Sequence, residues 1–168
     1  LNAPELDIDA ALGFGKALMA GSKMERPREM TLAAEIGRAT VAGFTGRNAS
    51  ARLKIDSDGV EIGRLSVADL GGAAFSASGR IITSGTPQGS VRVDLDASDM
   101  KPVLALLSRF APDTAQALQS RAAAMAPAKL RAQLSLDGAA PATQGKIDIE
   151  GNLGKVKVAF NGEGKVDA

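Results

Sequence analysis

The sequence predicts a mainly β protein with a helix pair, an α+β fold whose sheet is an antiparallel meander of about nine or ten strands. Three observations predict this fold class. Apolar and polar residues alternate in many short segments, as they do in strands that bury one face. Turn residues separate neighbouring segments, as in antiparallel hairpins. Residues 99–126 have helical spacing instead, and we expect these helices to pack on the apolar face of the sheet.

The expected strands follow one another with short turns between them. DSDG at residues 56–59 is a hairpin signal, and Gly71 and Gly72 form the next turn. The alternation slips its phase once, at Gly63. The expected strands lie around residues 6–10, 30–36, 51–55, 60–67, 73–81, 91–97, 130–136, 147–153 and 156–160.

Strict alternation in the later strands predicts one buried face. A slip of register by one residue would bury charged side chains, among them Arg92 and Asp94. We therefore expect one set of residues to share a buried face: Val91, Val93, Leu95, Leu130, Leu134, Ile147 and Ile149.

The strand at residues 73–81 has mostly small side chains on its apolar side, with Ala and Gly at most of the alternating positions. Such a face buries little by itself, because hydrophobic stabilisation scales with apolar area at about 25 cal/mol per Å². We expect something else to cover it.

The helical segment contains two helices with a proline between them. Asp99 is the expected N-cap of the first helix, and Pro112 ends it and begins the second. A weaker helical stretch spans residues 11–21. The expected anchors of the helix pair on the sheet are Leu104, Leu107, Phe110 and Leu118.

The chain of 168 residues suits one domain. LDIDA at residues 6–10 and VDLDA at residues 93–97 each precede a helical stretch, which suggests an internal repeat. We interpret residues 1–168 as one unit with candidate sub-units 1–92 and 93–168. The first residues do not resemble an export signal, so we expect the chain to be a fragment of a longer protein whose anchor or export signal lies outside it.

Composition argues against several classes of function. The chain has no His and no Cys, so the commonest general base, thiol nucleophile and transition-metal ligands are missing. The 20 Lys and Arg nearly balance the 19 Asp and Glu, and no basic run predicts nucleic-acid binding. We expect a protein that is not an enzyme and that needs no cofactor.

Three kinds of motif have simpler structural interpretations. Asp94, Asp96 and Asp99 resemble the start of a calcium loop, but its glycine and distal glutamate are missing; a solvated strand face that ends in a helix cap explains them. GFGK at residues 13–16 lacks the first glycine of a phosphate loop. The serines of the strands have no base partner in the sequence. We therefore predict no catalytic, cofactor-binding or metal-binding residue.

Three stretches, LSVADLGGAAFSASGRI, PQGSVRVDLDASDMKPVLALLSRFAP and APAKLRAQLSLDG, together resemble the periplasmic region of the AsmA family. The resemblance implies a curved sheet with an apolar groove, as in bridge-like lipid-transfer proteins, and a role in phospholipid transport and outer-membrane biogenesis. It also implies a periplasmic location in a protein anchored in the inner membrane, with membrane contact only through parts outside this chain. It carries over no catalytic residue.

Two functions remain open. In the first, one sheet face lines a path for phospholipid acyl chains, and the lipid-facing residues are Phe75, Ala77 and Ile81. In the second, the chain is a structural or protein-interaction module of the cell envelope whose own helices fill the core. Exposed sheet edges would also favour self-association, because their backbone groups are unpaired.

Overall fold

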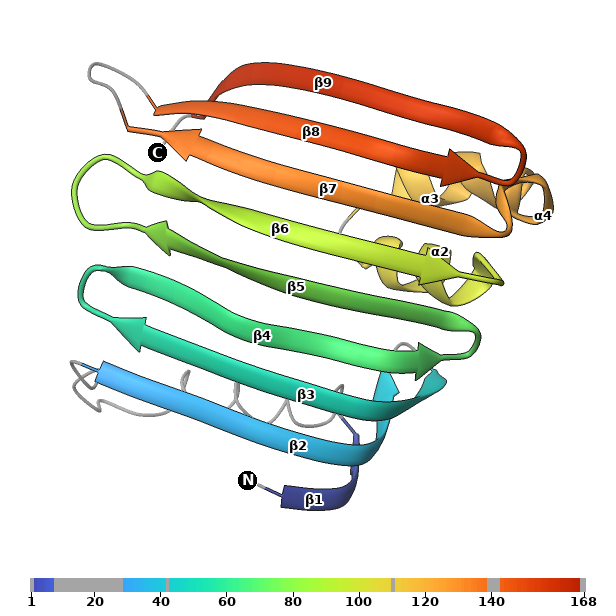
Figure 1. The fold of residues 1–168 in the computed structure, drawn as a ribbon, viewed down its shortest axis with the longest axis horizontal. Coiled ribbons are helices and arrows are strands. Elements are labelled where there is room, and N and C mark those ends of the chain that lie inside the picture. Colours follow the sequence, from blue (N-terminus) through green and yellow to red (C-terminus); the bar gives the residue numbers. More distant parts are fainter. Residues whose placement is uncertain (1, 8–28, 42, 110, 139–142, 167–168) are drawn as a thin grey trace.

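The computed structural model describes residues 2–7, 29–41, 43–109, 111–138 and 143–166. These residues form one open sheet whose nine strands follow the chain order from β1 to β9 (Figure 1). Strand β1 (Asn2–Asp7) is parallel to β2 (Glu29–Val41), and β2 to β9 form an antiparallel meander. The remaining strands are β3 (Phe44–Asp56), β4 (Gly59–Leu70), β5 (Ala73–Ile82), β6 (Gln88–Ala97), β7 (Ala128–Asp137), β8 (Thr143–Leu153) and β9 (Val156–Val166).

The strands confirm the predicted class and correct its detail. The protein is mainly β, and the expected antiparallel meander is present. Within the described ranges the meander has eight strands, because β1 joins the sheet parallel to β2. The predicted strand at residues 6–10 is described only as far as Asp7, and the helical stretch predicted at residues 11–21 lies outside the described residues.

Two predicted hairpin turns are confirmed, and an aspartate side chain closes each of them. At the β3–β4 turn, Asp56 Oδ1 accepts hydrogen bonds from the N–H groups of Asp58 and Gly59, each at 3.0 Å. At the β4–β5 turn, Asp69 Oδ1 accepts a hydrogen bond of 2.9 Å from the N–H of Gly72. Aspartate favours turns because its short side chain can bond to the backbone two or three residues ahead.

A β-bulge at Gly63 keeps the apolar residues of β4 on one face. Ile62 pairs with Leu53, but Arg64 pairs with Arg52, so β4 has one more residue than β3 at this level. The extra residue changes which alternate positions face the apolar side. The phase slip predicted at Gly63 is confirmed.

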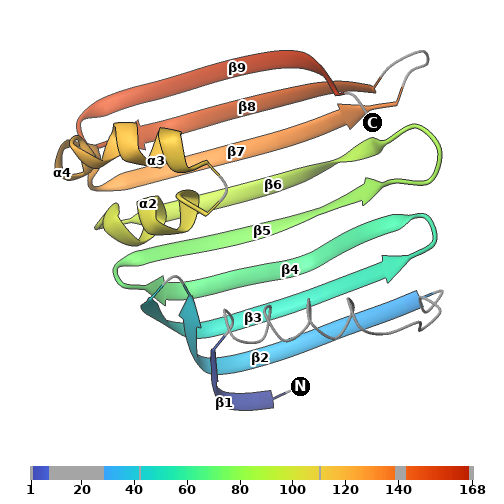
Figure 2. The same ribbon diagram turned by 180° about the vertical axis from the view of Figure 1, so that it is seen from behind.

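A second irregularity, at Asn48, has no signal in the alternation. Asn48 has a φ of 51°, in the left-handed region that asparagine tolerates better than most residues. Beyond it the buried residues move from one set of alternate positions to the other in three strands. A buried row of Ala39, Gly46 and Leu70 forms there across β2, β3 and β4. Gly46 lies so close to Val67 that a Cβ there would be 3.0 Å from Val67 Cγ1. The β2–β3 hairpin bends out of the sheet at this end (Figure 2).

Gly79 allows β5 to lie close to β6. Its φ is 148°, and a Cβ at this position would lie 2.2 Å from the carbonyl oxygen of Ser90. A larger residue would therefore force the two strands apart. The close approach of the β6 backbone therefore requires a small residue at this position, independently of the space above the sheet.

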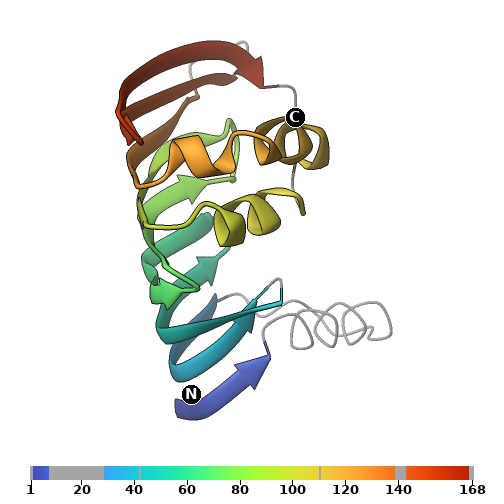
Figure 3. The ribbon, with the colours of Figure 1, turned by 90° about the vertical axis from the view of Figure 1, so that its right-hand side faces the viewer.

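Helices α2 (Lys101–Leu107), α3 (Pro112–Gln119) and α4 (Ala122–Met125) connect β6 to β7. They lie on one side of the sheet, near one end of its strands (Figures 2 and 3). The predicted second helix is thus divided into α3 and α4. Pro112 is the first residue of α3, as predicted. The N-cap of α2 is Met100 and not the predicted Asp99, although Asp99 Oδ1 accepts a 2.9 Å hydrogen bond from the N–H of Lys101.

In the part of the chain that the structure describes, the core consists of two clusters at the sheet end that carries the β4–β5 turn. The first cluster joins β2, β3 and β4 through Ala34, Ile36, Ala39, Ala49, Val67 and Leu70. The second cluster joins the sheet to the helices. It consists of Ala73, Ala97, Met100 and Ala128, with Leu95, Val103, Ala122, Met125, Ala126 and Leu153 packed against them.

The expected anchors of the helix pair need correction. Leu104 is buried at 4% exposure but is outside the cluster that joins the helices to the sheet. Leu107 and Leu118 are half-buried and are also outside it, and Phe110 lies outside the described residues. The side chains that join the helices to the sheet come from Met100, from the next turn of α2 and from α4. The sequence did not predict them, because helical periodicity defines an apolar stripe on a helix but not the element against which the stripe packs.

We predict that Leu70→Ala and Leu134→Ala differ strongly in their effect on stability. Leu70 is 2% exposed and Leu134 is 42% exposed, so the first truncation should lower the free energy of unfolding by about 2–5 kcal/mol. The second should lower it by less than about 1 kcal/mol. Urea denaturation of both variants measures the difference. Equal losses would mean that Leu134 is covered as fully as Leu70.

Candidate functional site

Cross-strand pairing aligns apolar residues in four neighbouring rows that run across β2 to β9. We call these four rows the open tract. In the described strands, every position of the open tract is a Gly, an Ala or a larger apolar residue. The first row is Ile36, Ala49, Val67, Phe75, Leu95, Leu130, Gly151 and Val158; the second is Ala34, Ala51, Leu65, Ala77, Val93, Ala132, Ile149 and Phe160; the third is Leu32, Leu53, Ile62, Gly79, Val91, Leu134, Ile147 and Gly162; the fourth is Met30, Ile55, Val60, Ile81, Gly89, Leu136, Gly145 and Gly164.

Much of the open tract is in contact with solvent. The prediction that the later strands share one face is confirmed, but the predicted burial is wrong for Val93, Leu134 and Ile147, which are 37–42% exposed. The other four residues of that set, Val91, Leu95, Leu130 and Ile149, are only half-buried. The reason is that α2 to α4 reach only one end of this face. The large apolar side chains exposed on the tract are Met30, Leu32, Ile55, Val93, Leu134, Ile147 and Phe160.

A fifth row, next to the first, shows what the helices do cover. In this row Ala73 is 2% exposed, and Ala97 and Ala128 are fully buried. These alanines contact the residues of the helix cluster, so their small side chains make room for helices. Among the described residues, no alanine of the open tract belongs to this helix cluster.

The dimensions explain why the helices leave most of the face uncovered. Neighbouring strands are about 4.8 Å apart, so the eight strands of the meander span about 34 Å. The seven residues of α2 and the eight of α3 make helices of about 10 and 12 Å. Helices of this length cover the end of a few strands and no more.

The predicted lipid-facing residues lie together on the open tract. Phe75, Ala77 and Ile81 belong to its first, second and fourth rows, and Gly79 occupies the third. All three predicted residues are half-buried. Residues of the other strands, such as Leu32 and Phe160, were not singled out by the sequence, although the alternation that marks them is the same.

The opposite face of the sheet, which we call the polar face, carries ion pairs between neighbouring strands. Arg131 Nε donates to Asp94 Oδ1 at 2.9 Å, and Lys129 Nζ lies 3.0 Å from Asp96 Oδ2. The hydrogen bond and the negative charge of Asp94 raise the pKa of Arg131. Asp94 and Asp96 therefore pair with strand β7, while Asp99 bonds to the start of α2, in agreement with the interpretation as a strand face that ends at a helix.

Two hollows lie mainly on the polar face. One, of about 790 Å³, is lined by the ion-paired Asp94 and Arg131 among others. The other, of about 540 Å³, is lined by Arg52 and Arg64 at the β-bulge and by Glu35. In the described part of the chain, neither hollow contains a cluster of carboxylates that could hold a metal ion. Their chemistry is that of solvated charged side chains.

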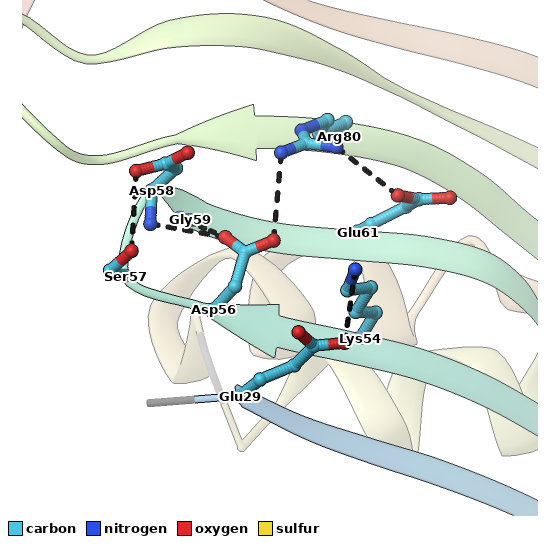
Figure 4. A network of polar contacts seen from close by, with 8 residues as sticks. All are labelled: Glu29, Lys54, Asp56, Ser57, Asp58, Gly59, Glu61 and Arg80. Atoms are coloured by element: carbon cyan, nitrogen blue, oxygen red, sulfur yellow. Dashed lines mark hydrogen bonds and ion pairs between the residues drawn. The ribbon is translucent and has the colours of Figure 1, made fainter. Parts of the chain in front are cut away.

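The polar residues around the β3–β4 turn form the network drawn in Figure 4. Arg80 reaches both strands of the hairpin, with Nη2 at 3.7 Å from Asp56 Oδ2 and Nη1 at 3.3 Å from Glu61 Oε2. Lys54 Nζ lies 3.1 Å from Glu29 Oε1, and this contact raises the pKa of Lys54. The network fixes the end of the sheet that the helices do not reach.

The pKa of Asp56 is lowered by a balance of opposing effects. Partial desolvation raises it, but the N–H groups of Gly59 and Asp58 bond to the charged form and lower it, and the positive charges of Arg80 and Lys54 add to this. The lowering effects together outweigh desolvation. The charged carboxylate therefore stabilises the hairpin.

Comparisons with family models, with curated proteins and with solved structures found no match to this chain. No helix among the described residues is both long and apolar enough to cross a bilayer. The phosphate-loop-like GFGK at residues 13–16 lies outside the described residues. The open tract is therefore the candidate site, on the geometry of its four rows alone.

We predict that the stabilising effect of the Asp56 charge depends on pH. A carboxyl whose pKa is lowered on folding adds stability above its unfolded-state pKa of about 3.9, and this is lost as the pH falls through the folded-state value. Asp56→Asn should therefore be less stable than the wild type at neutral pH, and the difference should shrink below about pH 4. Denaturant unfolding at several pH values measures it.

The matched control for this prediction is Asp58→Asn. The carboxylate of Asp58 accepts one exposed hydrogen bond, of 3.3 Å, from Ser57 Oγ, so this variant should change stability less. A loss at Asp56→Asn that stays constant with pH would contradict the assigned role of the charge.

Proposed function

We propose that the open tract binds the acyl chains of phospholipids, and that the chain is a non-enzymatic part of a lipid-transport system of the cell envelope. The observation that carries this proposal is the uninterrupted apolar character of four rows across eight strands. An acyl chain needs an apolar surface and no hydrogen-bond partner, and the tract offers the first without the second. The resemblance to the AsmA family supports the same function, in a periplasmic, inner-membrane-anchored protein.

The size of the tract supports a ligand that extends across several strands. Four rows occupy about 20 Å along the strands, and the meander spans about 34 Å across them. Soluble monomers rarely expose contiguous apolar patches of more than a few hundred Å² without a function. The proposal gives this area a partner, and it places the helices as a cover over one end of the path.

The alternative is a structural or protein-interaction module whose helices fill its own core. The second buried cluster favours this interpretation at the end of the sheet where Ala97 and Ala128 contact the helix cluster. It does not account for the exposure of Leu32, Leu134 and Ile147 farther along the strands. A protein partner on the open tract would account for it, so the experiments below separate lipid from protein.

We predict that photo-crosslinking from the apolar face captures lipid. A photoreactive phenylalanine analogue is placed at Ala77 or Ile81, with Ser76 and Ser78 of the same strand as controls on the polar face, and adducts formed in cells are identified by mass spectrometry. Lipid adducts are expected from the first two positions and not from the controls. Adducts to protein alone at positions 77 and 81 would support the interaction module instead.

We also predict that a charge on the tract blocks lipid binding without unfolding the protein. Ala77→Arg places a guanidinium where acyl chains would lie, and an unpaired charge in an apolar environment is strongly unfavourable. The amount of lipid that copurifies should fall at least about tenfold, which corresponds to 1.4 kcal/mol. Ser76→Arg on the polar face, beside Asp94, should leave it unchanged. Equal effects of both variants would contradict the proposal.

A further inference from the structure

The hollow beside the β-bulge differs from the other hollow of the polar face in the way its charges are paired. In the larger hollow, Lys129 and Arg131 each lie against an aspartate of β6. In the smaller hollow, Arg52 of β3 lies directly opposite Arg64 of β4 in the register. Within the described part of the chain, neither of these two guanidiniums forms an ion pair. The smaller hollow therefore holds two positive charges that no carboxylate contacts.

This opposition of two arginines is unfavourable and is an exception on the polar face. Like charges in directly opposite positions of an antiparallel pair are destabilising, because the Cβ atoms are only about 4.5–5.5 Å apart. In the next row, Lys54 and Arg80 each contact a glutamate. Arg92 of β6, opposite Ser78 of β5, also has no ion pair among the described residues and contacts the amide oxygen of Gln133, at 3.5 Å. Positive charge thus collects around the bulge.

Gly63 keeps space open beside Arg52. Its φ lies outside the left-handed region that favours glycine. A Cβ at this position would lie 3.5 Å from Cγ and 3.6 Å from Cδ of Arg52, which is ordinary van der Waals contact. A larger side chain at position 63 would lie against the stem of Arg52 and take up part of the hollow that Gly63 lines. The space that the glycine leaves is available to a ligand of the two arginines.

We propose that this hollow binds the phosphate group of a phosphate monoester between Arg52 and Arg64. A guanidinium can hold phosphate oxygens through two parallel N–H···O bonds, and such charge-assisted bonds are about twice as strong as neutral ones. A phosphate monoester carries a charge of about −1.5 to −2 at neutral pH, so one group offsets both guanidiniums. The ligand converts the repulsion across the β3–β4 pair into attraction.

Two other side chains of the hollow affect the affinity in opposite ways. Ser50 Oγ lies 2.8 Å from Ser66 Oγ, and either hydroxyl can be the donor. When Ser66 donates, the hydroxyl of Ser50 can donate to a phosphate oxygen. Glu35 also lines the hollow, and its negative charge weakens the binding of an anion. Glu35 lowers the affinity without abolishing it, because two arginines oppose one glutamate.

The volume of the hollow fits a small organic phosphate. It measures about 540 Å³, within the range of about 300–1,000 Å³ of small-molecule sites, so the organic part of the ester has room beside the phosphate. The hollow lies on the polar face, opposite the open tract. A lipid whose acyl chains lie on the tract therefore cannot place its own headgroup here, and the inference stands whether or not the tract binds lipid.

Calorimetric titration with inorganic phosphate and with glycerol 3-phosphate tests the site, at an ionic strength held constant with sodium chloride. Both probes should bind the wild-type chain. Arg64→Gln should weaken their binding at least about tenfold, because it removes one of the two guanidiniums. Glu35→Gln should tighten it about threefold. The matched control is Arg47→Gln, which should bind as the wild type does, because Arg47 lies on the same strand as Arg52 but pairs with Asp69, at 3.7 Å.

Thermal unfolding measures the repulsion between the two arginines independently. Without phosphate, Arg64→Gln should melt at a higher temperature than the wild type, because the opposed charges are gone. At saturating phosphate the melting temperature of the wild type should rise, and that of the variant should change much less. A variant that melts below the wild type without phosphate would contradict the assigned repulsion.

Vesicles identify the source of the phosphate group. Phosphatidic acid presents a phosphate monoester at a membrane surface, and phosphatidylcholine serves as the control lipid. Vesicle binding that needs phosphatidic acid and is lost in Arg64→Gln would assign the site to a lipid headgroup, and binding of glycerol 3-phosphate alone would assign it to a soluble ester. The proposal is overturned if the wild type binds none of these probes at constant ionic strength, or if Arg47→Gln weakens binding as much as Arg64→Gln.

Discussion

The cross-strand register is the constraint on which the rest of this structure depends. Side chains alternate between faces along each strand, so the apolar face stays apolar only if every strand enters the sheet in the same phase. The alternation of apolar and polar residues changes phase within β4, and the bulge at Gly63 compensates for this with one extra residue. Asn48 makes a comparable change near the start of β3, where Ala39 and Leu70 of the neighbouring strands stay buried. These two irregularities keep the apolar residues together across the whole meander.

On this face the most closely packed residues and the most exposed apolar residues lie in different parts of the sheet. Both buried clusters lie at the end of the sheet with the β4–β5 turn, where Leu70 and Ala97 are almost completely covered. At the other end the hairpins are held by polar contacts, such as those of Arg80 with Asp56 and Glu61. Such exposed ion pairs add little stability each. Among the described residues, the packing that stabilises the fold is concentrated at one end of the sheet and includes Ile36, Ala49 and Val67 of the first row. The protein can therefore leave much of the third and fourth rows of the open tract uncovered.

Alternation and turn residues predicted most of the strands, the hairpin at Asp56, the bulge at Gly63 and the face on which Phe75 lies. They report the side of the sheet to which a residue points but not what covers that side, so the exposure of Leu134 could not be predicted. The bend at Asn48 was missed because a left-handed asparagine leaves no mark on the pattern. The predicted site residues lie together on the apolar face, whereas their lipid-binding role and the sub-units 1–92 and 93–168 stay predictions.

The small residues of β5 do not share one physical cause, and at two of the three positions the cause lies within the protein itself. Ala73 is small because the helix cluster packs against it, and Gly79 because its Cβ position is occupied by the backbone of β6. Ala77 has neither constraint, since it lies between the two on the open tract and pairs with Leu65 and Val93. A larger apolar side chain there would add buried area at about 25 cal/mol per Å². Among the described residues, neither the helices nor a neighbouring backbone requires a small side chain at this level, and the acyl-chain path that we propose on the open tract would use the space above it.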